Sequence, residues 1–403
     1  MKQILFFICC AVLMTACKKD ENNDTPTVAQ RTVMVYMSGD NNLSGIVSED
    51  IREMQQGITG IPQNNNLVVF IDRAISNEKP FIARVTKEAK LDTLYKYPYD
   101  FYASDPELFG EVLQQITTLC PAKEYGLVLW GHATGWVVES DTIAQRRAYG
   151  VDNGQWMNIT QMARALEGLK DQSVLPKLSF IFADCCNMMG AEVAYELRNH
   201  ADYLIGSPAE IPGFGAPYHK IVKYLFSQSD NFYEGIIDEY ANTYSNYLPL
   251  SVIRLSEMEQ LASATKAVLP AVAEHLKQGD DVATKGIIYY YSPNGRYDNI
   301  NKTMYDMNDM IRTALLEQPE AYETWHQALL QAVPKRVTAP MWETMNTNTV
   351  NFNDFTVTDA KQGCVSMFFP LDLYYAKTCL YTYNTDIKNM QWYQAVGWSS
   401  VGY

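Results

Sequence analysis

Histidine is scarce in this sequence, and the residue spacings that usually bind metals are missing. The chain has 403 residues and five histidines, none of which lies in a His-Glu-x-x-His pattern. It contains no close Cys-x-x-Cys pairs and no Asp-x-Asp-x-Asp loop of the calcium-binding kind. It also has no internal repeat and no low-complexity tract. The pattern argues against a metalloenzyme, and we predict no metal ligands.

Positive charge is also in short supply. Lysine and arginine number 32 against 46 aspartates and glutamates, so the formal net charge is -14. Removal of an N-terminal segment that contains Lys2 takes away one positive charge and leaves -15. Such a surface repels phosphate backbones, and we expect no nucleic-acid partner. The hydrophobic content of 47% is that of a globular protein, and the length favours one large domain with a smaller C-terminal region.

The cysteines do not form a disulfide framework. Of the eight cysteines, Cys9, Cys10 and Cys17 belong to the N-terminal segment. The remaining five are scattered and odd in number: Cys120, Cys185, Cys186, Cys364 and Cys379. Such a set argues against a disulfide scaffold or a zinc site, so we expect at least one free thiol.

The N-terminal residues have the pattern of an exported lipoprotein. Lys2 precedes an apolar run over residues 4–13, and small residues stand directly before Cys17. The run is roughly half of the ~20 apolar residues that a transmembrane helix needs, so we predict a signal peptide over residues 1–16. Lipidation of Cys17 would anchor the chain to the outer membrane, with residues 17–30 as a polar tether. Acidic residues early in the tether resemble the surface-export signal of Bacteroides-type lipoproteins, although any solvated linker carries such charges.

Short apolar runs alternate with helix-like stretches in the first half of the chain. The runs are too short for helices and end in polar or small residues; they cover 31–38, 66–72, 125–130 and 177–183. Apolar residues at helical spacing mark the stretches 48–56, 106–118, 159–169 and 188–200. This alternation predicts an α/β fold with a largely parallel sheet and helices on both faces. Residues 81–97 indicate a hairpin at an edge of the sheet.

Beyond about residue 216 the alternation loosens. Helix-like segments at 230–247 and 256–276 precede strand-like runs at 286–291 and 363–369. We therefore expect a smaller C-terminal α+β region that completes the core and shapes a cleft.

Parallel sheets collect functional residues where their strands end, because the connecting loops converge there beside helix N-termini. Asp40, Asp72, His132 and Cys186 all fall at or just past the end of a predicted strand. A cysteine and a histidine from two such ends can act as a nucleophile and its proton acceptor. Taken alone, such residues are more often a core cysteine or a hydrogen-bonded structural histidine than catalytic groups.

We predict that Cys186 attacks a substrate carbonyl and that His132 is its acid-base partner. A helix expected from about Met188 would give the thiol thiolate character, and a neighbouring imidazole would lower the thiol pKa further. The N–H groups of Ala133 and Cys186 would bind the oxyanion, in a glycine-flanked loop that lets the substrate backbone approach. Histidine suits the role because its ordinary pKa, about 6.5, lets it exchange protons near neutrality.

Three segments resemble motifs of the clostripain family of cysteine peptidases, relatives of the caspases and legumains. They are residues 33–43 (VMVYMSGDNNL), 127–136 (LVLWGHATGW) and 182–192 (FADCCNMMGAE). Two further segments are also similar to the family, residues 206–218 (GSPAEIPGFGAPY) and 363–370 (GCVSMFFP), so that the resemblance covers about residues 31–398. It implies a caspase-like fold, a Cys-His dyad and protein or peptide substrates.

Two positions depart from the family pattern. The family commonly has Gly after the histidine, where this chain has Ala133, and Asp-Ala-Cys at the nucleophile, where this chain has Asp184, Cys185 and Cys186. Alanine keeps the N–H group that an oxyanion needs. Cys186 has the family's spacing from Asp184, so we assign it as the nucleophile and keep Cys185 as the alternative.

The resemblance also implies cleavage after Arg or Lys. Asp184 would line the first substrate pocket and Glu210 would lie at its base, because a buried carboxylate discriminates strongly in favour of a guanidinium. In the structural alternatives, Asp184 caps the following helix and Glu210 is simply exposed in a Pro/Gly loop. Self-cleavage is expected after Arg147, which lies in a dibasic, polar stretch. Calcium is implied by the resemblance alone, and the chemistry itself requires no cofactor.

The combined prediction is a secreted, lipid-anchored cysteine endopeptidase that acts as a monomer. Residues 31–215 would form the caspase-like catalytic core, and residues 216–403 a C-terminal subdomain that completes the peptidase. The alternative is a non-catalytic surface lipoprotein that binds peptides or glycans through its 27 tyrosines and 7 tryptophans. Aromatic richness usually reflects core packing, which makes this alternative the weaker one.

Overall fold

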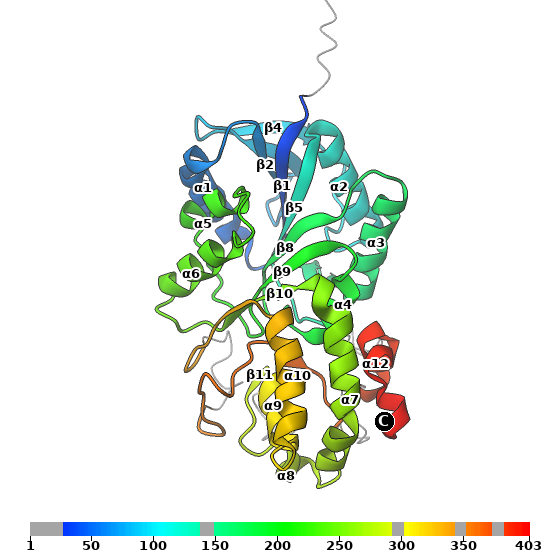
Figure 1. The fold of residues 1–403 in the computed structure, drawn as a ribbon. Coiled ribbons are helices and arrows are strands. Elements are labelled where there is room, and N and C mark those ends of the chain that lie inside the picture. Colours follow the sequence, from blue (N-terminus) through cyan, green and yellow to red (C-terminus); the bar gives the residue numbers. More distant parts are fainter. Residues whose placement is uncertain (1–26, 138–148, 292–301, 343–351, 373–382) are drawn as a thin grey trace, which may run out of the picture.

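A nine-stranded sheet organises the computed structural model, which describes residues 27–137, 149–291, 302–342, 352–372 and 383–403. Cys17, Arg147 and Cys379 lie outside these ranges. The strand order is β13-β10-β9-β8-β5-β1-β2-β3-β4 (Figure 1). The five central strands are parallel: β9 (Ala201–Gly206), β8 (Leu178–Asp184), β5 (Ala122–Trp130), β1 (Ala29–Gly39) and β2 (Asn65–Arg73). Antiparallel strands extend both edges: β3 (Phe81–Val85), β4 (Leu91–Lys96), β10 (Leu250–Arg254) and β13 (Lys335–Val337).

The central strands are apolar almost throughout because both faces of the sheet are covered. In β1, Val33, Val35 and Met37 join one hydrophobic cluster while Met34 and Tyr36 join another, since successive side chains point to opposite faces. The first face is covered by α1 (Ser44–Gly57), α5 (Tyr218–Leu225) and α6 (Tyr233–Thr243), and the second by α2 (Pro106–Leu119), α3 (Ile159–Asp171) and α4 (Ala191–Leu197) (Figure 1). The predicted α/β fold with helices on both faces is confirmed.

Most predicted elements correspond to observed ones. The four predicted strands are β1, β2, β5 and β8, the hairpin is β3 with β4, and the first three predicted helices are α1, α2 and α3. The start of the fourth helix is wrong, because α4 begins at Ala191 and not near Met188. Asn187 has a φ of 60°, and its N–H donates to Ala209 O at 2.9 Å. The segment after Cys186 is therefore a turn that is tied to the loop following β9.

The second half of the chain first extends the sheet and then builds a smaller α+β region beside it (Figure 1). Its short three-stranded sheet has the order β11 (Tyr289–Tyr291), β12 (Thr303–Asp306), β14 (Ser366–Met367). α7 (Met258–Leu276) packs against α9 (Met307–Ala314), α10 (Pro319–Ala332) and α12 (Gln391–Val396), and the shorter helices are α8 (Asp280–Ala283) and α11 (Tyr383–Asp386). A separate hairpin, β6 (Tyr149–Asp152) with β7 (Gln155–Met157), lies between β5 and α3 in the sequence. The predicted C-terminal α+β region is confirmed.

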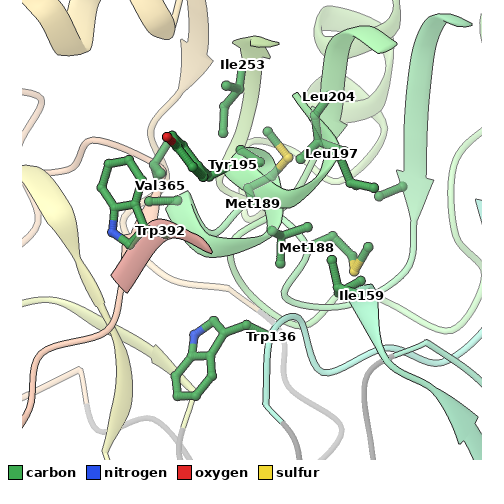
Figure 2. Close-up of a cluster of buried hydrophobic side chains, with 14 of the residues drawn as sticks. Trp136, Ile159, Met188, Met189, Tyr195, Leu197, Leu204, Ile253, Val365 and Trp392 are labelled. Carbon is green, nitrogen blue, oxygen red and sulfur yellow. The ribbon is translucent and has the colours of Figure 1, made fainter. Parts of the chain in front are cut away.

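One buried cluster joins the two regions (Figure 2). Met188 and Met189, in the turn before α4, belong to the same cluster as Trp136 from the loop after β5 and Val365 beside β14. The N–H of Ser366 donates to Met189 O at 2.9 Å. The C-terminal region therefore packs directly against the turn that carries the predicted nucleophile.

Candidate active site

β5 carries His132 to the carboxyl edge of the sheet. The strand ends at Trp130, whose indole N–H donates to Asp50 Oδ2 in α1 at 2.6 Å. Gly131 follows with a φ of 139°, and a Cβ at this position would lie 2.8 Å from Ser38 O. Only glycine tolerates both the backbone angle and the close contact. This bend fixes the direction in which His132 leaves the sheet.

β8 carries the two adjacent cysteines to the same edge. It pairs with β5, with Trp130 opposite Asp184. Cys185 is fully buried in the hydrophobic core, whereas Cys186 is half-buried and lines a cavity that His132 also lines. A core thiol has no route to a substrate, so this placement favours Cys186 as the nucleophile.

The cavity at this edge is small. It has a volume of about 30 Å³, which is room for one or two water molecules. Its lining consists of Leu43, Trp130, Gly131, His132, Asp184, Cys186, Ile211, Pro212, Gly213 and Gly215. The structure thus brings together His132, Cys186 and Asp184 from the predicted site. Ala133 is the buried residue directly after His132, and Glu210 directly precedes the lining residue Ile211.

The surroundings of Cys186 and His132 favour the uncharged thiol and the uncharged imidazole near neutral pH. Burial, followed by the negative charge of Glu210, raises the pKa of the Cys186 thiol to about 12. Burial also lowers the pKa of His132. The expected thiolate is wrong here, because α4 begins at Ala191 and the thiol does not lie at the helix N-terminus. The N–H of Ile211, 3.4 Å from Sγ, donates to the sulfur instead.

Asp184 is enclosed, and most of its acceptor capacity is used. Oδ1 accepts from the N–H of Ala216 at 2.9 Å and the hydroxyl of Tyr240 at 3.1 Å, and Oδ2 accepts from the hydroxyl of Tyr218 at 2.7 Å. The alternative in which Asp184 caps α4 is wrong, because α4 begins after Gly190 and has no side-chain cap. Burial raises the pKa of Asp184 to about 6, so the group is mostly ionised at neutral pH. A buried anion in the cavity wall suits a cationic side chain.

Asn42 lies next to His132 and was missed by the sequence prediction. Its Oδ1 is 2.7 Å from His132 Nε2. The strand-end rule selects the nearby Asp40. The pair of asparagines directly after it was the sequence feature that could have pointed to Asn42. The other strand-end acid, Asp72, does not line the cavity. Burial, followed by the negative charge of Asp152, raises the pKa of Asp72.

In the described part of the chain, no three His, Cys, Asp or Glu side chains come together to hold a metal ion. Calcium therefore has no such ligand group within these ranges, and no step below depends on it. In the same ranges no helix combines the length and apolar character needed to cross a bilayer. The prediction of a free thiol is confirmed, since the described cysteines Cys120, Cys185, Cys186 and Cys364 are all free.

A peptidase family model matches almost the whole chain. The model describes the clostripain family, Peptidase C11, and it matches residues 35–401. The chain belongs to the clostripain family. The family inferred from the sequence motifs is thereby confirmed.

Individual family members agree with this assignment. Clostripain of Hathewaya histolytica is 27% identical over 220 residues, which make up 47% of this chain and 41% of that protein, so the match spans less than half of its length. A secreted C11 cysteine protease from Bacteroides thetaiotaomicron, solved with an irreversible peptide inhibitor, is 28% identical; the match covers 92% of this chain and 100% of that one, with a TM-score of 0.74. An inactive zymogen C11 protease from Parabacteroides distasonis is 27% identical, with 92% and 99% coverage and a TM-score of 0.72. The predicted class, a caspase-like cysteine peptidase of the clostripain family, is confirmed.

Proposed function

We propose that this clostripain-family chain is an endopeptidase in which Cys186 is the nucleophile and His132 the general acid and base. The proposal rests on one observation above all: the two side chains come from the neighbouring strands β5 and β8 and line the same cavity. The rival function, a non-catalytic binding lipoprotein, is not favoured, because the two solved relatives that cover 92% of the chain are C11 proteases.

The neutral pair favours proton transfer during attack over a preformed ion pair. As Cys186 Sγ bonds to the peptide carbonyl carbon, its proton moves to the His132 imidazole, and the carbonyl π electrons become an oxyanion. The oxyanion collapses, the C–N bond breaks, and the imidazolium gives its proton to the departing amine. A water molecule, deprotonated by His132, then hydrolyses the thioester, which releases the acid and restores the thiol.

Donors and charges around the pair suit a peptide substrate. The N–H groups of Ala133 and Cys186 would bind the oxyanion, and the loop is held in place by Gly150, whose N–H donates to His132 O at 2.8 Å. Asp184 at the cavity wall supports a preference for Arg or Lys, and the nearby charge of Glu210 adds to the negative potential. The carboxylate of Asp184 and the main chain around Gly215 would meet the end of such a side chain in this cavity.

Export and activation complete the proposal. A secreted relative supports export, and we propose that lipidation of Cys17 anchors the chain. We also propose that the enzyme cleaves substrates after basic residues and cleaves itself after Arg147. β6 begins two residues beyond Arg147 in the sequence, and the N–H of its Gly150 donates to His132 O. The contact between Ser366 and Met189 supports a role for residues 216–403 in completing the peptidase formed around residues 31–215.

A peptide library tests the proposed function. We expect the wild type and Cys185→Ala to cleave after basic residues and Cys186→Ala to be inactive. Loss of cleavage only in Cys185→Ala would move the nucleophile by one residue, and retention in both variants would refute a cysteine mechanism. On a denaturing gel, the wild type should show fragments from a cut after Arg147 that the Cys186→Ala protein lacks. If the wild type and Cys186→Ala both run as the same intact band, self-processing is refuted.

A further inference from the structure

We infer that Asn42 is a positioning residue for the proposed reaction: it holds the neutral His132 ring as the Nε2–H tautomer and leaves Nδ1 to exchange the proton with Cys186. The geometry is a 2.7 Å contact between Asn42 Oδ1 and His132 Nε2. An amide oxygen only accepts, so Nε2 must carry the hydrogen. In a neutral imidazole the other nitrogen then has a free lone pair, which a general base requires.

The fold holds Asn42 in place through its neighbour Asn41. Asn41 Oδ1 accepts from the N–H of Leu43 at 2.8 Å, and its Nδ2 donates to Ser38 O at 3.0 Å and to Val151 O at 2.8 Å. The last two bonds join the end of β1 to β6. Because Gly150 of β6 also donates its N–H to His132 O, the loop segments that carry Asn42 and His132 are both tied to the same short strand.

Strand order explains why these residues meet. β1 and β5 are neighbours, with Met37 paired to Trp130, so Asn42 and His132 both lie a few residues beyond a paired strand end. Leu43, next to Asn42, lines the cavity together with His132 and Cys186. Asn42 therefore lies beside the proposed dyad, on the side of the ring that carries Nε2.

The bond should matter most when the ring is charged. As Cys186 gives its proton to Nδ1, Nε2–H becomes part of an imidazolium and donates a stronger, charge-assisted bond to Asn42 Oδ1. The same proton later leaves from Nδ1 to the departing amine, while Nε2 keeps its hydrogen throughout. Asn42 thus orients the ring for both transfers without exchanging a proton itself.

The inference rests on the proposed function, and the experiment combines kinetics with a measurement that needs no catalysis. Wild type, Asn42→Ala and Asn42→Asp would be compared with Asn242→Ala, an exposed control in α6. The readouts are kcat and KM on an arginyl peptide between pH 5 and 9, and the ¹⁵N-NMR tautomer of His132, assigned by its loss in His132→Ala.

We expect Asn42→Ala to lower kcat by about 10-fold with little change in KM, since the partners that orient metal-bound histidines contribute roughly 10- to 100-fold and water can partly replace an exposed amide. Asn42→Asp should raise the pKa of the His132 imidazolium, because a carboxylate stabilises the charged ring. The acidic limb of the pH profile should therefore move to higher pH, and kcat should be restored above it. The control should match the wild type.

Three results would overturn the inference. The first is a wild-type kcat in Asn42→Ala. The second is an effect on KM alone, which would make Asn42 a substrate contact. The third is a neutral His132 that carries its hydrogen on Nδ1. A wild type that cleaves no peptide yet shows the Nε2–H tautomer, lost in Asn42→Ala, would refute the proposed function and leave the hydrogen-bonding assignment intact.

Discussion

The preference for basic substrates should depend on the charge of Asp184, and the substitution Asp184→Asn tests this with little change in volume. The carboxylate has about four acceptor positions, and three are occupied by Ala216, Tyr218 and Tyr240. One position therefore remains for a substrate guanidinium. A hydrogen bond to a charged group contributes about 1.5–3 kcal/mol, so Asp184→Asn should lower kcat/KM for an arginyl peptide about 10- to 150-fold. A citrullinyl peptide, which is neutral and nearly the same shape, should be affected far less.

The same residue predicts a pH dependence. Because burial raises the pKa of Asp184 to about 6, the carboxylate is charged above that pH and becomes neutral as the pH falls through it. The ratio of arginyl to citrullinyl kcat/KM should therefore be high at pH 7–8 and decline below about pH 6. His132 acts on both substrates, so its titration cancels in the ratio.

The assay is fluorogenic cleavage of the two peptides between pH 5 and 8, with thermal melting as a check that each variant folds. The exposed Asp202, at the opposite end of the sheet, provides the control Asp202→Asn. An Asp184→Asn enzyme that keeps the wild-type ratio at pH 7.5 would refute the assignment of basic specificity to this carboxylate. A wild-type ratio that does not change with pH would refute its titration near 6.

Two further substitutions test the fold around the site. Gly131→Ala introduces a Cβ 2.8 Å from Ser38 O at a φ of 139°, so it should cost about 1–3 kcal/mol of stability and reduce kcat by displacing His132; an unchanged melting temperature would contradict this account. Arg31→Met removes a buried guanidinium that binds Glu124 and the carbonyl oxygens of Leu225 and Ser227. Urea unfolding should show a loss of about 1–3 kcal/mol, because two carbonyl oxygens lose their donor while the partly exposed Glu124 stays solvated; an unchanged midpoint would mean that these contacts are energetically neutral.

The sequence predicted the central strands from their apolar runs and the two candidate catalytic residues from their positions at strand ends. The runs that became β1, β2, β5 and β8 are apolar because both sheet faces are covered, so their existence and parallel direction could be predicted, whereas their order in the sheet could not. The strand-end rule then selected His132 and Cys186, which do line one cavity. Both residues follow paired positions on adjacent strands, and a parallel register brings such positions to the same edge.

Features set by loop conformation were harder to predict. The turn at Asn187 delays the start of α4, and the apolar residues Met188 and Met189 did not reveal it because they are buried in the turn, as residues on the inner face of a helix would be. Asn42 was missed since its role depends on a contact with a residue from another loop. The high pKa of Cys186 was likewise hidden, because it follows from tertiary burial and from the charge of Glu210.

The central claim is that the Cys186 sulfur is the nucleophile of a peptidase that cleaves after basic residues. The most direct measurement is to treat the wild-type protein with an arginyl acyloxymethyl ketone, digest it and locate the adduct by mass spectrometry. The account predicts a single adduct on Cys186 that is lost in His132→Ala. An adduct on Cys185, or unmodified Cys186 in protein that still cleaves peptides, would contradict it.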